Sequence, residues 1–375
     1  MRLLICAGGT GGHVYPALAA VANLKSIFMA RFGQGYRGLT LQWVGTRGGM
    51  EADLVSQAGI PLEVVRASGI VGKGLVAGVC GALNLIWGSL EALWIVRRFQ
   101  PDMVLVTGGY SAIPIAVAAW IWGVPIAVYL PDIEPGLAVR SVARLARIIL
   151  VTSEESRRFF PNDKIRVIGY PVRPEIIEAS KGHMTMARQH FGLAVQRPTL
   201  LVVGGSRGAR SINTALLDAV SELVGQAGIQ IVHVTGTLDW QVMRSRRAAL
   251  AADIREYYHV YRYLSDDMGL ALRAADLVVS RAGASSLGEY PVFGLPAILV
   301  PYPHAWHYQR VNADALASHG AAVRMNDEDL GKDLAITIRD LLSDEDRLSR
   351  MQSQMRLLAM PEAGERLAVE LVSLA

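Results

Sequence analysis

Arg2-Leu3-Leu4-Ile5-Cys6-Ala7-Gly8-Gly9-Thr10-Gly11-Gly12-His13 is an apolar run that ends in a glycine-rich turn, and helix-forming residues follow it. This order predicts a buried strand, a tight turn and a helix. Glycines lack a Cβ and adopt positive φ, so an anion can approach the N–H groups of the turn and of the helix start. Thr10 adds a hydroxyl and His13 a titratable imidazole, so the turn is a candidate phosphate site.

The glycine pattern matches neither the dinucleotide fingerprint G-x-G-x-x-G nor a Walker A loop. An ordinary strand-to-helix turn, with His13 as a polar residue of the first helical turn, stays open as the alternative.

Short apolar runs alternate with helix-length segments in the first half of the chain. This alternation predicts a parallel, doubly wound α/β sheet whose ligand sites lie beyond the carboxyl ends of the strands. The predicted strands are residues 3–6, 41–44, 62–65, 103–106, 126–129, 148–151 and 164–168.

The same pattern restarts at Thr199, and a chain of 375 residues exceeds the size at which single cores stop growing. We therefore expect two similar domains that face each other across a cleft, with the hinge near residues 165–175. The predicted strands of the second domain are residues 199–203, 229–235, 260–263, 277–280 and 297–301.

Composition narrows the class of protein. Hydrophobic residues make up 51% and charged residues 19%, which excludes a disordered chain. The net charge of +4 is compatible with phosphate-bearing ligands or an anionic membrane surface, and no basic cluster with interleaved aromatics indicates nucleic acid.

The chain has 2 cysteines, Cys6 and Cys80, and no C-x-x-C pair, so we expect no disulfide framework or structural zinc, and a reducing cytoplasm fits. The early first strand leaves no room for a signal peptide.

Two long apolar runs need separate interpretations. The stretch 75–96 has one charge, Glu91, and basic residues at its ends, so it predicts either a buried helix or, by a slight preference, a helix that presents an apolar face to an anionic membrane. The run 111–130 is broken by prolines and glycine, which predicts a packed helix and a central strand, with Trp120 and Trp122 in the core.

The second half contains two further candidate anion turns. Residues 204–210 repeat the strand, glycine and hydroxyl design of the first turn, and residues 280–289 end a strand with small residues whose N–H groups suit a pyrophosphate. Glu289 suits the two hydroxyls of a ribose, although a carboxylate that favours the helix dipole is the alternative. Gln309 and Asn312 lie three apart on one predicted helix, where they can bind a sugar or a base edge.

No metal-ligand spacing occurs, so we expect neither a metal nor a cofactor. The acidic clusters Asp266-Asp267 and Asp327-Glu328-Asp329 read more simply as helix caps or solvated loops. Together the loops indicate a phosphorylated, nucleotide-like ligand.

These motifs resemble those of the MurG family of peptidoglycan glycosyltransferases over nearly the whole chain. In chain order they are Gly-Gly-Thr-Gly-Gly-His at 8–13, Gly108-Gly109-Tyr110, Gly169 with Pro171-Val172-Arg173, Gly205-Ser206 with Gly208-Ala209-Arg210, Arg281 with Gly283-Ala284, Glu289, Gly294-Leu295-Pro296, and Gln309 with Asn312-Ala313.

The resemblance implies a GT-B fold of two Rossmann-like domains with a cleft between them. It implies an inverting transfer of N-acetylglucosamine from UDP-GlcNAc to lipid I, the undecaprenyl-linked acceptor, which makes lipid II for the cell wall, and hence a role in cell shape and division. The expected place is the cytoplasmic face of the cell membrane, peripherally bound, with stretch 75–96 toward the lipid. We expect residues 1–167 to form the acceptor and membrane domain and 168–375 the UDP-sugar domain, with the last helix packed back on the first.

The resemblance also assigns roles by position. It makes His13 the candidate general base, Ser265 a backbone contact to uracil, Glu289 the ribose carboxylate and Gln309 a contact to the sugar hydroxyls. The remaining expected contacts to the donor's sugar and diphosphate are Thr10, Gly11, Gly12, Asp132, Arg173, Ser206, Ala284, Ser285 and Ser286.

Three positions depart from the family pattern. Asp132 stands where the family has an asparagine, Tyr170 where it has another, and Arg207 where it has a glutamine. Asp132 has lost the amide donor and is a rival candidate for the base, since a carboxylate in a cleft can have a raised pKa. The other readings that stay open are a related lipid or natural-product glycosyltransferase, a UDP-GlcNAc 2-epimerase, and an inactive UDP-sugar-binding scaffold.

Overall fold

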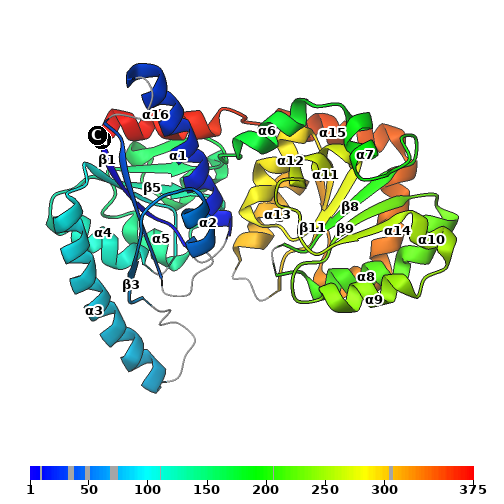
Figure 1. The fold of residues 1–375 in the computed structure, drawn as a ribbon, viewed down its shortest axis with the longest axis horizontal. Helices are drawn as coiled ribbons and strands as arrows, with labels where there is room; N and C mark the ends of the chain where they lie inside the picture. The colour runs from blue at the N-terminus through cyan, green and yellow to red at the C-terminus, as the bar shows by residue number, and fades with distance from the viewer. Residues whose placement is uncertain are drawn as a thin grey trace. The chain divides into compact units, whose positions relative to one another are not determined.

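The computed structural model describes residues 1–8, 11–32, 38–46, 51–67, 75–109, 111–205, 207–303 and 307–375, with the backbone alone for residues 32 and 75–86. The chain divides into two compact units (Figure 1). Unit 1 consists of Met1–Arg173 and Pro361–Ala375, and unit 2 of Pro174–Met360.

Unit 1 is built on a parallel 7-stranded sheet in the order β3-β2-β1-β4-β5-β6-β7. From β1 the chain adds β2 and β3 on one side of the sheet, and it then adds β4 to β7 on the other side. The point between β1 and β4 is the switch point, where doubly wound sheets bind ligands. The strands are β1 (Arg2–Cys6), β2 (Thr40–Thr46), β3 (Leu62–Val65), β4 (Met103–Val106), β5 (Ile126–Leu130), β6 (Ile148–Val151) and β7 (Ile165–Val167).

Helices cover both faces of this sheet (Figure 1). One face packs against α3 (Leu75–Phe99), α4 (Ala112–Ile121) and α5 (Leu137–Val142), and the other against α1 (Gly11–Phe32), α2 (Glu51–Gln57) and α16 (Ala363–Leu374). Because both faces are covered, the central strands are apolar on both sides, as Leu3, Leu4 and Ile5 are.

The C-terminal helix α16 completes unit 1. Leu367, Ala368 and Leu371 are fully buried in the same core cluster as the apolar residues of α1. Gly364 allows the two helices to approach, since a Cβ there would lie 2.6 Å from the side-chain amide of Asn23.

Unit 2 has a parallel 6-stranded sheet in the order β10-β9-β8-β11-β12-β13, the order of a dinucleotide-binding fold, with its switch point between β8 and β11. The strands are β8 (Thr199–Val203), β9 (Gln230–Val234), β10 (Tyr258–Tyr261), β11 (Leu277–Ser280), β12 (Ala297–Leu299) and β13 (Ala322–Arg324). The α-helices are α6 (Pro174–Lys181), α7 (Met184–His190), α8 (Arg210–Ser221), α9 (Trp240–Ala248), α10 (Ala252–Glu256), α11 (Met268–Ala274), α12 (Glu289–Phe293), α13 (Tyr308–Ser318), α14 (Leu330–Ser343) and α15 (Glu345–Leu357).

Two parallel sheets with helices on both faces confirm the predicted α/β fold class. The prediction was wrong in two details. The strand predicted at 260–263 is β10, Tyr258–Tyr261, and the edge strand β13 was not predicted.

The position predicted for Trp120 and Trp122 was also wrong. Their side chains are 62% and 44% exposed, because they lie where α4 ends and the chain turns at Gly123, whose φ is +69°. Among the described residues no helix combines the length and apolarity needed to cross a membrane.

Candidate active site

In unit 1 the first glycine turn lies at the switch point of the sheet. β1 leads through Gly8 toward α1, and the neighbouring β4 is followed by Gly108 and Gly109, which have φ of +140° and +96°. A Cβ on Gly109 would lie 3.1 Å from the carbonyl oxygen of Gly8. Glycine is therefore required at 109, because the two backbones meet there without side chains between them.

His13 lies in the first turn of α1, half-buried. The hydroxyl of Thr107 donates a hydrogen bond to the His13 carbonyl (2.8 Å), and a Cβ on Gly108 would lie 2.7 Å from the imidazole Cδ2. The imidazole therefore packs directly over the bare backbone that follows β4. Thr107 was not singled out from the sequence, because its role depends on a partner 94 residues away.

Asp132 lies beyond β5, on the far side of β4 from β1, and its charge acts on His13. Burial lowers the pKa of His13 below its usual value, and the Asp132 carboxylate opposes that shift. The imidazole is thus held in its neutral form at pH 7, with a carboxylate near enough to stabilise it once protonated. The structure brings together the two residues that the sequence offered as rival bases.

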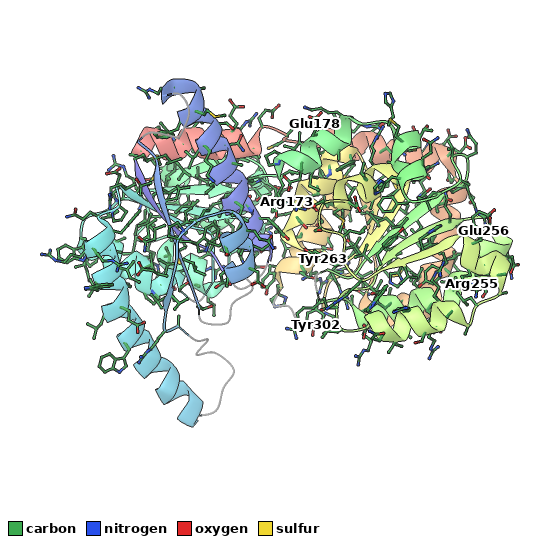
Figure 2. The ribbon with its side chains drawn as sticks, in the orientation of Figure 1. Arg173, Glu178, Arg255, Glu256, Tyr263 and Tyr302 are labelled. Atoms are coloured by element: carbon green, nitrogen blue, oxygen red, sulfur yellow. The ribbon has the colours of Figure 1, made fainter. Side chains whose placement is uncertain are left out.

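The other predicted contacts in unit 1 lie around the same turn. Gly11 and Gly12 are the first residues of α1, and Tyr15 packs against Gly11, where a Cβ would lie 3.0 Å from its ring. The guanidinium of Arg173 lies over the Tyr15 ring, 4.5 Å from its centre (Figure 2). Thr10 lies outside the described residues.

A buried carboxylate that the sequence did not reveal supports this turn. Glu51, the first residue of α2, is fully buried, and its Oε1 accepts hydrogen bonds from the Thr46 N–H (2.8 Å) and the Thr46 hydroxyl (3.2 Å). A Cβ on Gly8 or on Gly45 would lie 2.8 Å from the same oxygen. Two glycines therefore make room for Glu51 directly beneath the first turn.

In unit 2 the loops after β8, β11 and β12 converge, because these strands are adjacent and parallel. The loop after β8 holds Gly205 and Gly208 at φ of +82° and +92°, and α8 follows from Arg210. Gly204 leaves no space for a side chain, since a Cβ there would lie 2.4 Å from the Ala209 nitrogen. Ser206 lies outside the described residues.

The loop after β11 forms a short 3-10 helix, η4 (Ala284–Leu287), and then α12. Ala284 and Ser286 are buried, and the Ser286 hydroxyl donates to the Gly283 carbonyl (2.6 Å). Ser285 and Glu289 are half-buried, and Glu289 is the first residue of α12. Four of the predicted donor contacts therefore lie within six consecutive residues of one loop.

Gln309 and Asn312 of α13 have different environments. Gln309 is half-buried, and its Oε1 accepts a hydrogen bond from the N–H of Tyr302 on the loop after β12 (2.9 Å). Asn312 is fully buried and donates to the carbonyl of Ala282 (3.1 Å). Asn312 thus supports the β11 loop from behind instead of presenting its amide to a ligand. Ser265 is exposed in the loop that follows β10.

A separate feature of unit 1 is an exposed apolar surface, here called the aromatic patch. It is defined as Trp87, Leu90 and Trp94 of α3, Trp120 and Ile121 of α4, and Trp122 directly after α4. Trp87, Leu90 and Trp94 share one side of α3, while the other side packs on the core through Ala92, Ile95 and Val96.

Two arginines of α3 lie on this patch. The guanidinium of Arg98 lies 4.3 Å from the Trp94 ring centre, and that of Arg97 lies 5.0 Å from the Trp122 ring centre. Both lie within the range of cation–π attraction. Within the described part of the chain, no group of three or more His, Cys, Asp or Glu side chains is placed to hold a metal ion.

The chain matches known proteins over almost its whole length. The glycosyltransferase family 28 N-terminal domain matches residues 3–151, and the family 28 C-terminal domain matches residues 199–367. A Moorella thermoacetica protein named "UDP-N-acetylglucosamine--N-acetylmuramyl-(pentapeptide) pyrophosphoryl-undecaprenol N-acetylglucosamine transferase" is 40% identical over 97% of this chain and 96% of its own length. A Desulforamulus reducens protein of the same name is 38% identical over 97% of this chain and 96% of its own length.

The crystal structure of Acinetobacter baumannii MurG shares the fold, with a TM-score of 0.75, 24% identity and 99% of each chain covered. The two Rossmann-like units are therefore those of the GT-B fold. The chain belongs to glycosyltransferase family 28, among the proteins named as N-acetylglucosamine transferases.

Proposed function

We propose that this protein transfers N-acetylglucosamine from UDP-GlcNAc to undecaprenyl-pyrophosphoryl-N-acetylmuramyl-pentapeptide, lipid I, with inversion at the anomeric carbon. The observation that carries the proposal is the 40% identity over 97% of the chain to a protein named for this transfer. The grouping of His13, Asp132 and the bare glycine backbone at the switch point of unit 1 supports it.

Unit 2 binds the nucleotide in this proposal. The N–H groups of the loops that contain Ser206 and Ala284–Ser286 receive the diphosphate, because backbone N–H groups at helix starts favour anions. The Glu289 carboxylate accepts hydrogen bonds from the ribose hydroxyls, Gln309 binds the sugar hydroxyls, and the backbone at Ser265 contacts uracil.

Unit 1 supplies the proton acceptor. His13 is neutral at pH 7 because its pKa is lowered, so it can take the proton of the acceptor hydroxyl as that oxygen attacks the anomeric carbon. The bond from the anomeric carbon to the β-phosphate oxygen breaks, and UDP leaves with the negative charge. Asp132 stabilises the imidazolium that forms. The N–H groups of Gly11 and Gly12, the Thr10 hydroxyl and the Arg173 guanidinium stabilise the leaving diphosphate.

The aromatic patch binds the membrane that carries the acceptor, at its cytoplasmic face. Tryptophan side chains favour the membrane interface, and the Arg97 and Arg98 guanidiniums on the patch favour anionic headgroups. Flotation with anionic liposomes tests this contact. Changing both Trp94 and Trp120 to serine is expected to abolish flotation. Leu357→Ser, at a residue of unit 2 that is 77% exposed, is the control expected to leave it unchanged.

The decisive experiment supplies the purified protein with lipid I and radiolabelled UDP-GlcNAc, and measures lipid II and released UDP. Competing UDP-glucose and UDP-GalNAc test the sugar, which matters because Asp132 stands where the family has an amide. Lipid II formed from UDP-GlcNAc in preference to both competitors is the expected result.

Parallel reactions distinguish the other functions. Transfer to diacylglycerol but not to lipid I would identify a different lipid glycosyltransferase. Conversion of UDP-GlcNAc without any acceptor would identify an epimerase. Tight UDP binding with no product from any acceptor would indicate an inactive binding protein.

A further inference from the structure

A chain of buried hydrogen bonds runs through unit 2 behind the second glycine turn. His233, in the middle of β9, is fully buried, and its Nδ1 lies 2.8 Å from the Tyr258 hydroxyl while its Nε2 lies 2.9 Å from Oδ1 of Asn213. The Asn213 amide donates to the Thr235 carbonyl (3.0 Å) and to Oδ2 of Asp239 (3.0 Å). Asn213 is also fully buried, and Asp239 is 5% exposed.

The direction of each bond follows from the chemistry of its partners. The Asn213 NH₂ group is used on Thr235 and Asp239, so its Oδ1 must accept from His233. The proton of the imidazole therefore lies on Nε2, and Nδ1 accepts from the Tyr258 hydroxyl. Burial lowers the pKa of His233 to about 3, so the imidazole stays neutral and keeps this tautomer at physiological pH.

The hydrogen bonds from His233 and Asn213 end at residues that contact the glycine turn itself. A Cβ on Gly208 would lie 2.3 Å from the Thr235 carbonyl oxygen, and one on Gly236 would lie 2.1 Å from the Gly208 nitrogen. The turn is thus pressed against the end of β9 at the carbonyl that Asn213 holds. Asp239 is joined to the start of α8 by an ion pair with Arg210 (3.0 Å).

We propose that His233 is a positioning residue for nucleotide binding, which acts through Asn213 to fix the place of residues 208–210, where the second glycine turn enters α8. This rests on the proposed function, in which that turn receives the diphosphate. His233 does not touch the ligand. It orients the Asn213 amide, the amide holds Thr235 and Asp239, and these two residues contact the turn at Gly208 and Arg210. A sequence search for metal or catalytic histidines passes over it, since its partners come from α8 and β10.

The test compares four variants by the KM and kcat for UDP-GlcNAc, by calorimetric binding of UDP, and by amide hydrogen exchange of residues 204–210. His233→Phe removes both hydrogen bonds and keeps an aromatic ring. His233→Gln keeps a donor and an acceptor. Tyr258→Phe removes one hydroxyl. Val232→Ala truncates a neighbouring buried residue of β9 that takes no part in the hydrogen bonds of His233 and Asn213.

His233→Phe is expected to raise the KM and the dissociation constant of UDP about tenfold, with kcat changed far less, and to speed exchange in the turn. His233→Gln should recover much of the loss, and Tyr258→Phe, which is expected to fold even if His233→Phe does not, should shift KM in the same direction by less. Val232→Ala should lower stability without moving KM.

The proposal is overturned if Val232→Ala raises KM as much as His233→Phe does, or if Tyr258→Phe and His233→Phe leave KM and exchange in the turn unchanged. Hydrogen exchange needs no ligand. A wild-type protein that fails to bind UDP would therefore refute the proposed function, while faster exchange in the turn of His233→Phe would still report the structural link.

Discussion

The two glycine turns end equivalent strands of similar sheets, yet they are supported by different chemistry. The turn after β1 lies over Glu51, a fully buried carboxylate, and has Asp132 acting on the neighbouring His13. The turn after β8 is supported by His233 and Asn213, and Asp239 is paired with Arg210.

This difference separates two tasks. Negative charge near the first turn stabilises a protonated imidazole, which suits a group that takes up a proton. The same charge weakens the attraction of this turn for an anion before the proton is taken up, so the turn contributes less to ground-state binding than the second turn does. Behind the second turn His233 and Asn213 are neutral and the one carboxylate, Asp239, is paired with Arg210, so the positive potential of the N–H groups is reduced less, which suits binding of an anion. The comparison therefore predicts that changes around the first turn affect turnover and changes around the second affect affinity.

The largest effect is expected from His13→Ala. Loss of the proposed general base should lower kcat by about 10²–10⁴-fold, while the dissociation constant of UDP, which the proposal assigns to unit 2, should stay close to that of the wild type. Steady-state kinetics and calorimetry on the same preparation measure both. A parallel loss of UDP affinity would remove the separation between the two turns.

Glu51→Ala tests the charged support. It leaves the Thr46 N–H without its acceptor and should cost about 2 kcal/mol of stability in unit 1. Hydrogen exchange resolved by peptide should be faster than in the wild type in β1 and β2 and unchanged in β8 and β9. Asp53→Ala, at an exposed carboxylate on the same helix, is the matched control and should change little. Equal effects of the two substitutions would mean that the buried carboxylate gives no special support.

The neutral support of unit 2 predicts a pH dependence. The pKa of His233 is about 3 in the folded protein and near 6.5 when unfolded, so below pH 6.5 the unfolded state binds a proton that the folded state does not. Stability should fall as the pH drops from 6.5 toward 3, by roughly 1 kcal/mol per pH unit from this residue. Urea unfolding at several pH values should show a shallower decline for His233→Gln. Equal declines in stability with pH for the wild type and His233→Gln would contradict this prediction.

The smallest effect is a shift in a pH profile. The Asp132 carboxylate raises the pKa of His13 against the lowering effect of burial, so Asp132→Asn should move the acid limb of kcat/KM to lower pH. The pH profile is measured with saturating lipid acceptor over about two pH units on either side of neutrality. Loss of the acid limb, instead of a shift, would mean that Asp132 and not His13 controls it.

Local pattern was sufficient to predict most strands and the glycine turns, because an apolar run followed by glycines depends on neighbouring residues only. Trp120 and Trp122 were placed wrongly because apolarity predicts burial unless the end of the helix is known. Asn312 and Gln309 share a helix, and only packing shows that one faces the protein interior. Glu51, Thr107 and His233 depend on partners that the sheets bring together from distant segments, and no local signal marks them.

The inclusion of α16 in unit 1 has a consequence for synthesis. Residues 174–360 are made between the two parts of unit 1, so unit 2 can acquire all of its contacts while the core beside α1 still lacks Leu367, Ala368 and Leu371. During translation the half that contains His13 and the aromatic patch is thus the last to be completed. Under the proposed function, the nascent chain would bind its nucleotide before the unit that contains the proposed general base is complete.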